Sequence, residues 1–159
     1  MRRSLITLVF AIATVIASLC SAVGFGQNST QYYFKSLTVD DGLTHGVVTA
    51  ITQDDFGFMW FGTLDGLNRY DGSKFINYRK SDSIPYPIGS NHITCLQKAP
   101  DGKIWIGTWN AGLYRLDPRL QKFEALELPM ECREKYGNSK ITGISIIDHF
   151  LYASFENSA

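Results

Sequence analysis

The feature that most constrains this chain is an internal repeat centred on two tryptophans. A segment rich in glycine and aromatic residues, 54–72, returns later in the chain as 100–117. The shared positions are Gly57, Trp60, Gly62, Thr63, Gly66, Leu67, Arg69 and Asp71 in the first copy, and Gly102, Trp105, Gly107, Thr108, Gly112, Leu113, Arg115 and Asp117 in the second. The offset is 45 residues as far as the threonines and 46 after them, because the second copy has one inserted residue. A fixed period of this length is typical of solenoids, propellers and repeat arrays.

Each copy has the pattern of short strands joined by tight turns. Residues 47–51, 58–61 and 67–70 are apolar runs rich in β-branched and aromatic side chains, as strands are. Asp and Gly lie between them and suit the left-handed backbone of hairpin turns. The tryptophan is expected to fill the space between neighbouring sheets, and the glycine two residues later to admit a close strand. Because one four-stranded sheet cannot bury two apolar faces alone, the sequence predicts an all-β fold of stacked β-propeller blades.

The order of these residues resembles the two-component regulator propeller repeat. The resemblance rests on the pattern V-x-A-I-x-Q-D-x-x-G-x-x-W-x-G-T-x-x-G-L-x-R-Y-D-G-x-x-F over residues 48–75, on the lead-in 37–45, and on the second copy. It covers roughly residues 33–155. The second copy departs from the pattern at Pro100, Ala111 and Pro118, which are turn positions. In this family the repeat builds the periplasmic sensor of hybrid histidine kinases of Bacteroides-type bacteria.

The repeat and the resemblance together predict the organisation of the chain. We expect two four-stranded blades and the start of a third, which would form an incomplete ring. The expected parts are a signal peptide (1–26), a lead-in strand (27–41, with the strand itself at 32–37), a first repeat (42–90), a second repeat (91–140) and a truncated third repeat (141–159). Within the second repeat, residues 129–140 are expected to form a polar loop. Since the third blade stops after two strands, we expect the chain to be the N-terminal fragment of a longer sensor, which the downstream coding DNA would test.

The N-terminus has the pattern of a secretory signal peptide. Arg2 and Arg3 precede the uncharged, apolar residues 5–19, and small residues follow, so cleavage is expected after Ala22 or Gly26. The alternative is an uncleaved membrane anchor, because residues 4–26 carry no charge. Either way the sequence predicts export to the periplasm.

The composition excludes some classes of function. Without Arg2 and Arg3 the chain has 13 basic and 15 acidic residues and no basic stripe, so we expect no contact with nucleic acid. His45, His92 and His149 lack metal-ligand spacing, and no catalytic triad, phosphate-binding loop or carboxylate pair is present. We therefore expect no metal, no cofactor and no catalysis in this chain.

Several side chains have both a structural and a functional interpretation. The core D-x-G-x-x-W, which begins at Asp55, matches the Asp-box hairpin of some glycosidase propellers; a turn aspartate that locks a hairpin is the favoured interpretation. Arg69 and Arg115 are expected to build the repeat, by pairing with Asp71 and Asp117, or else to contact an acidic glycan.

The cysteines and the loop tips complete the candidate residues. Cys95 takes the place of small residues in the other copies and is expected to be a small buried filler, with a Cys95–Cys132 disulfide as the alternative. Rings stack on sugar rings and amides bond hydroxyl groups, so the candidate ligand-binding residues are Trp109, Asn110, Tyr86 and Asn91.

The resemblance implies a sensory function. Such a propeller would bind an oligosaccharide and, in the full-length dimer anchored in the inner membrane, signal to a histidine kinase that lies outside this chain. Two alternatives stay open: the start of a secreted propeller lyase or glycosidase with catalytic residues in later blades, and a secreted adhesion or scaffold propeller. The sequence does not identify the sugar or the number of blades.

Overall fold

The structure is a computed structural model that describes residues 31–81 and 87–156. Contacts divide the chain into two units, Met1–Lys35 and Ser36–Ala159. The expected signal peptide lies outside the described residues. Among the described residues, no helix has the length and hydropathy that a membrane span requires.

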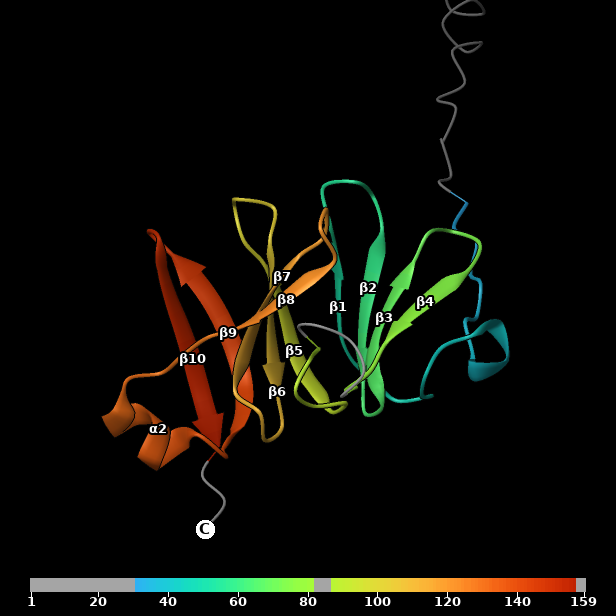
Figure 1. Cartoon of the computed structure of the whole chain (residues 1–159). Helices are drawn as coiled ribbons and strands as arrows, with labels where there is room; N and C mark the ends of the chain where they lie inside the picture. The colour runs from blue at the N-terminus through green and yellow to red at the C-terminus, as the bar shows by residue number, and fades with distance from the viewer. Residues whose placement is uncertain (1–30, 82–86, 157–159) are drawn as a thin grey trace, which may run out of the picture. The chain divides into compact units, whose positions relative to one another are not determined.

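Antiparallel sheets make up most of the second unit (Figure 1). The first sheet has four strands, β1 (Val48–Gln53), β2 (Met59–Thr63), β3 (Gly66–Tyr70) and β4 (Phe75–Tyr78). The second also has four, β5 (Ile93–Lys98), β6 (Ile104–Thr108), β7 (Leu113–Asp117) and β8 (Lys122–Ala125). The third has two, β9 (Lys140–Ile147) and β10 (Phe150–Glu156). Strands that are neighbours in a sheet follow one another in the chain, which confirms the predicted blade pattern.

Each blade begins with a strand that carries a β-bulge at a threonine. The pairing registers of β1, β5 and β9 skip Thr49, Thr94 and Thr142. A bulge leaves one residue outside the ladder and increases the local twist. The hydroxyl group of Thr49 lies 3.0 Å from the carbonyl oxygen of Gly62 and 2.8 Å from that of Ile93, so this bulge also ties the first blade to the second.

The main core lies between the first two sheets. Trp60 is fully buried there, as predicted, and stacks on Tyr78 with ring centroids 5.6 Å apart. The buried members of this cluster come from both sheets and from the loop between them: Trp60, Leu67, Ile88, Ile93, Ile104, Ile106, Leu116 and Phe123. Trp105, the equivalent residue of the second blade, is only half-buried, because it faces the sheet that has two strands.

The glycines that follow the tryptophans allow neighbouring blades to touch. A Cβ atom on Gly62 would lie 2.7 Å from Cγ2 of Ile93, at the start of the second blade. A Cβ atom on Gly107 would lie 2.8 Å from Cγ2 of Ile141, at the start of the third. Both distances are too short for carbon atoms, so a side chain at either position would push the blades apart.

Two expectations about secondary structure are wrong. Residues 32–37 do not form a strand; residues 31–38 are irregular, and a short 3-10 helix, η1 (Val39–Asp41), follows. None of the three described sheets includes this segment, and a strand without a pairing partner leaves its backbone groups unsatisfied. Residues 129–140 are not all loop, because α2 (Met130–Tyr136) forms within them. Its glutamate, arginine and lysine residues are good helix formers, and Pro129 suits the position before its first turn.

The two described cysteines have free thiols. Cys95 is half-buried in β5 and Cys132 is exposed on α2, so the alternative of a disulfide between them is not formed. Burial raises the pKa of the Cys95 thiol, which keeps it in the unreactive protonated form. The position of Cys95 in the sheet agrees with a small filler.

Candidate functional site

Asp54 locks the hairpin between β1 and β2. Its carboxylate accepts hydrogen bonds from the backbone N–H groups of Phe56 (2.9 Å) and Phe58 (3.0 Å). It also accepts one from the indole N–H of Trp60 at 2.8 Å, and the residue is only 4% exposed. Asp54 therefore joins a turn to the core.

The sequence pattern predicts this role for Asp55, one residue later in the chain. Asp55 forms an ion pair with Lys98 of the next blade, at 2.6 Å, and does not close the turn. The second blade has Ala99 at the position equivalent to Asp54, so the lock is specific to the first blade. These contacts give the aspartates a structural role.

The arginines of the repeat contact aromatic rings. The guanidinium of Arg69 lies 4.6 Å from the ring centroid of Phe58. Arg115 lies 5.8 Å from the ring centroid of Trp105 and forms an ion pair with Glu124 at 2.7 Å. Cations over aromatic faces hold adjacent strands together, so these side chains build the blade.

The expected pairing of these arginines with Asp71 and Asp117 is wrong. Asp71 accepts hydrogen bonds from the backbone N–H groups of Ser73 and Lys74, both at 2.8 Å. These bonds favour the ionised carboxylate and lower the pKa of Asp71 to about 2. Asp117 accepts in the same way from the backbone N–H of Arg119, at 2.9 Å. Both carboxylates accept hydrogen bonds from the backbone of their own turns. The two arginines instead contact aromatic rings, and Arg115 also pairs with Glu124.

The predicted ligand-binding residues lie on segments that gather at one end of the sheets. In each four-stranded sheet the first strand begins, and the fourth ends, beside the turn between the second and third strands. The loops from one sheet to the next therefore lie at the same end as the β2–β3 and β6–β7 turns, the lower end in Figure 1. We call this end the junction end.

The junction between the first and second blades is closed by polar contacts. Arg79 forms an ion pair with Asp65 at 2.7 Å. The amide group of Asn91 donates to the same carboxylate at 3.1 Å and accepts from the backbone N–H of Lys80 at 2.7 Å. The carbonyl oxygen of Asn91 accepts from the backbone N–H of Gly66 at 2.7 Å. Asn91, one of the predicted ligand residues, is thus engaged in holding two blades together.

The second junction has a loop of the same length but different side chains. Residues 127–140 replace residues 79–92. The places of the aspartate, arginine and asparagine that close the first junction are taken by Ala111, Glu127 and Ser139. In the described part of the chain no hydrogen bond joins these three residues to one another, and a cavity of about 960 Å³ lies here.

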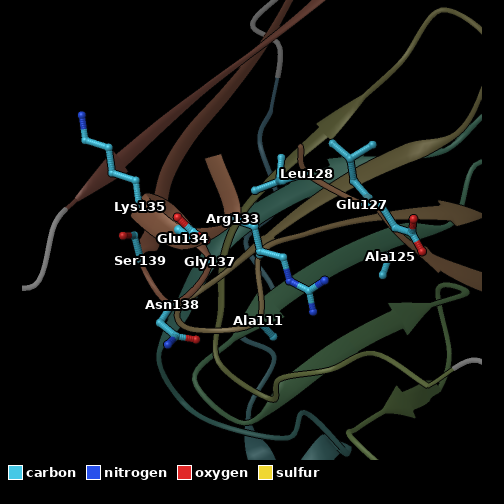
Figure 2. Close-up of a pocket in the computed structure, with 12 residues that line it drawn as sticks. Ala111, Ala125, Glu127, Leu128, Arg133, Glu134, Lys135, Gly137, Asn138 and Ser139 are labelled. Atoms are coloured by element: carbon cyan, nitrogen blue, oxygen red, sulfur yellow. The ribbon is translucent and has the colours of Figure 1, made fainter. Parts of the chain in front are cut away.

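The β6–β7 turn, the end of β8 and the helix α2 line this cavity (Figure 2). Its volume is near the upper end of the range of small-molecule sites, roughly 300–1,000 Å³. Arg133 extends from α2 into the space between Ala111 and Ala125, whereas the side chain of Lys135, which also lines the cavity, points away from Arg133 (Figure 2). Glu134 of the helix and Glu127, which follows β8, also line the cavity. The site therefore offers hydrogen-bond donors and acceptors together.

Trp109 lies between β6 and β7, directly before Asn110. Its side chain is 46% exposed and stacks on His92, with ring centroids 4.6 Å apart. The ammonium group of Lys140, which pairs with Glu156 at 2.7 Å, lies 4.8 Å from the same ring centroid. Burial, with a smaller contribution from Lys140, lowers the pKa of His92. The imidazole of His92 and the ammonium group of Lys140 therefore already contact the indole ring to which a sugar would bind.

None of the predicted ligand residues in the described ranges lines the cavity. Trp109 and Asn110 directly precede Ala111, which lines the cavity. Asn91 belongs to the first junction, and Tyr86 lies outside the described residues.

The sequence analysis missed the charged residues of the cavity. Arg133, Glu127 and Glu134 lie outside the repeat pattern, in a segment that was expected to be a loop. The only signal in the sequence was the equal length of the two junction loops, combined with their different residues. In the described ranges no group of three or more His, Cys, Asp or Glu side chains could hold a metal ion.

Comparison with known proteins identifies the repeat. The family described as "Two component regulator propeller" matches residues 42–65 and 87–110, one segment in each four-stranded sheet. Histidine kinase P4 of Formosa agariphila is 39% identical over 70 residues, which are 44% of this chain and 5% of that protein.

Solved structures show the same fold. The extracellular domain of the hybrid two-component system BT3049 from B. thetaiotaomicron superposes with a TM-score of 0.67 and 29% identity, over 77% of this chain and 18% of that one. The corresponding domain of BT4673 from the same organism gives a TM-score of 0.57 over 70% of this chain and 14% of that one. At 23% identity this second likeness concerns the fold alone. The chain spans only a small part of the length of each of these proteins.

Proposed function

Because the chain carries two-component regulator propeller repeats and is homologous to the extracellular domain of a hybrid two-component system and to a histidine kinase, we propose that it senses a carbohydrate for such a system. On this proposal the chain is exported and forms part of a larger propeller. Its own role is to bind the ligand, and the kinase reaction belongs to another part of the full-length protein.

The observation that carries this proposal is the cavity at the second junction. Sugar hydroxyl groups donate and accept hydrogen bonds, and the cavity lining offers carboxylates of Glu127 and Glu134 beside the donors of Arg133 and Asn138. Alanine and leucine side chains supply the apolar part of the wall. Asn110 directly precedes the lining residue Ala111 in the chain.

The position of the cavity also supports a role in signalling. One wall belongs to the second blade, and the other belongs to the loop that leads into β9 of the third. A ligand that contacts both walls stabilises the packing in which they are correctly spaced. Ligand binding therefore shifts the equilibrium between packings of the two blades, and that shift is the output of a sensor.

Calorimetric titration of the purified chain with a panel of neutral and acidic oligosaccharides tests the proposal. We expect binding, and we expect Glu127→Gln to weaken it about 3- to 10-fold, because a charged acceptor of hydroxyl groups is lost. Glu131→Gln is the matched control, since Glu131 is exposed on α2 and does not line the cavity. If no glycan of the panel binds, the carbohydrate proposal is wrong.

A further inference from the structure

The side chain of Arg133 has no counter-charge among the described residues. No ion pair or hydrogen bond engages its guanidinium there, although two glutamates line the same cavity. In the first junction, by contrast, the arginine has a counter-charge, because Arg79 pairs with Asp65 at 2.7 Å. In the second junction the residue equivalent to that aspartate is Ala111, which has no charge.

From this contrast we propose that the carbohydrate of the cavity carries a carboxylate, as a uronic acid does, and that Arg133 binds this carboxylate. The inference rests on the function proposed above and specifies its ligand. A planar guanidinium bonds a carboxylate through two parallel N–H groups. In the first junction Arg79 donates one N–H group to the carboxylate of Asp65 and another to the backbone carbonyl oxygen of the same residue.

The other charges of the cavity fix the orientation of such a ligand. Lys135 also lines the cavity, but its side chain points away from Arg133, which extends into the space between Ala111 and Ala125 (Figure 2). Glu127 and Glu134 repel a second carboxylate but accept hydrogen bonds from hydroxyl groups. The acid group of the sugar therefore lies at Arg133, and the hydroxyl groups of the ring lie at the glutamates.

A neutral sugar is expected to bind this site more weakly than an acidic one. It leaves the guanidinium without a counter-charge and offers it hydroxyl acceptors, which form weaker hydrogen bonds than a carboxylate does. Because Arg133 is exposed at the cavity mouth, part of this preference is screened by salt. The site is thus expected to distinguish acidic from neutral sugars by their charge and to do so most strongly at low ionic strength.

The test uses pairs of disaccharides that differ only by a carboxylate in place of a hydroxymethyl group, such as cellobiouronic acid and cellobiose. The full chain is titrated with several pairs of different linkage, in low-salt buffer, by calorimetry. We expect the acidic member of at least one pair to bind about 5- to 10-fold more tightly than its neutral partner. Arg133→Gln should abolish this preference and leave the affinity for the neutral sugar almost unchanged.

Lys74→Gln is the control, since it removes a positive charge from an exposed side chain of the first blade that does not line the cavity. It should keep the preference for the acidic sugar. Equal binding of both members of every pair, or equal loss in the two variants, overturns the role of Arg133 but leaves carbohydrate sensing intact. If none of the sugars binds, both proposals are wrong. Circular dichroism of each variant establishes that it is folded.

Discussion

At the level of single side chains, Asp54 connects the β1–β2 turn with the core. Its carboxylate accepts from the backbone of Phe56 and Phe58 and from the indole of Trp60. Asp54→Ala leaves these donors without an acceptor in a buried site. We expect the free energy of unfolding to fall by about 3 kcal/mol, measured by urea denaturation followed by tryptophan fluorescence.

Asp55→Ala is the control for this prediction, because it removes the neighbouring carboxylate. Asp55 forms a largely exposed ion pair with Lys98, and such pairs contribute about 0–1 kcal/mol. Equal destabilisation by the two substitutions would contradict the role given to Asp54.

Glu124 provides a second prediction at this scale, through the dependence of stability on pH. Hydrogen bonds from Arg115 and Lys122 lower the pKa of Glu124 from 4.5 to about 2. A carboxyl group with a lowered pKa stabilises the folded state above its unfolded pKa, and this contribution disappears as the pH falls through the folded pKa. Glu124→Gln should therefore be less stable than the parent at pH 6, and the difference should shrink between pH 4.5 and pH 2.

Urea denaturation of both proteins across this pH range measures the effect. Glu131→Gln, on the exposed surface of α2, serves as the control and should follow the parent chain throughout. A difference between Glu124→Gln and the parent that stays constant down to pH 2 would show that the ion pairs do not stabilise the fold.

At the level of elements, the strands were predictable and two connecting segments were not. The strands repeat with Trp60 and Trp105, so each copy supports the assignment of the other. The helix α2 has no counterpart in the described part of the first junction loop, and its polar residues suit a loop as well as a helix. Residues 32–37 have the composition of a strand, but strand formation also requires a partner, which composition does not report.

The anchoring of α2 is testable. Tyr136 stacks on Phe155 of β10, with ring centroids 5.0 Å apart, and occupies the place that Ile88 takes in the first junction. Tyr136→Ala should free the helix from the third sheet and increase the rate of amide hydrogen exchange in α2 and at the end of β10. Met130→Ala, on the exposed start of the same helix, should leave exchange unchanged. Unaltered exchange in the Tyr136 variant would show that other contacts hold the helix.

At the level of the whole molecule, repetition decides what a sequence can reveal about a site. The blades could be recognised in the sequence because close contact with the next blade requires a glycine in both copies, at Gly62 and at Gly107. The cavity exists where the copies differ, at Ala111 and Glu127, so the repeat pattern contains no information about it. The loop tips indicated Trp109 and Asn110, which only precede the lining residue Ala111 in the chain, and the charged residue Arg133 could be found only from the position of α2.

The shared core implies that the first two blades unfold together. Ile104 is fully buried in β6 and belongs to the same cluster as Trp60 and Leu67 of the first blade. Ile104→Ala removes contacts on which both sheets depend and should cost about 2–5 kcal/mol. In native-state hydrogen exchange, protection should fall by the same amount in β2 and β6, because the two sheets cannot bury their facing surfaces separately.

The third sheet packs at the opposite face of the second blade through Ile141 and has exposed apolar residues, such as Phe150. It should therefore exchange faster than both in the parent chain. Loss of protection confined to the second blade would show that each blade is an independent folding unit.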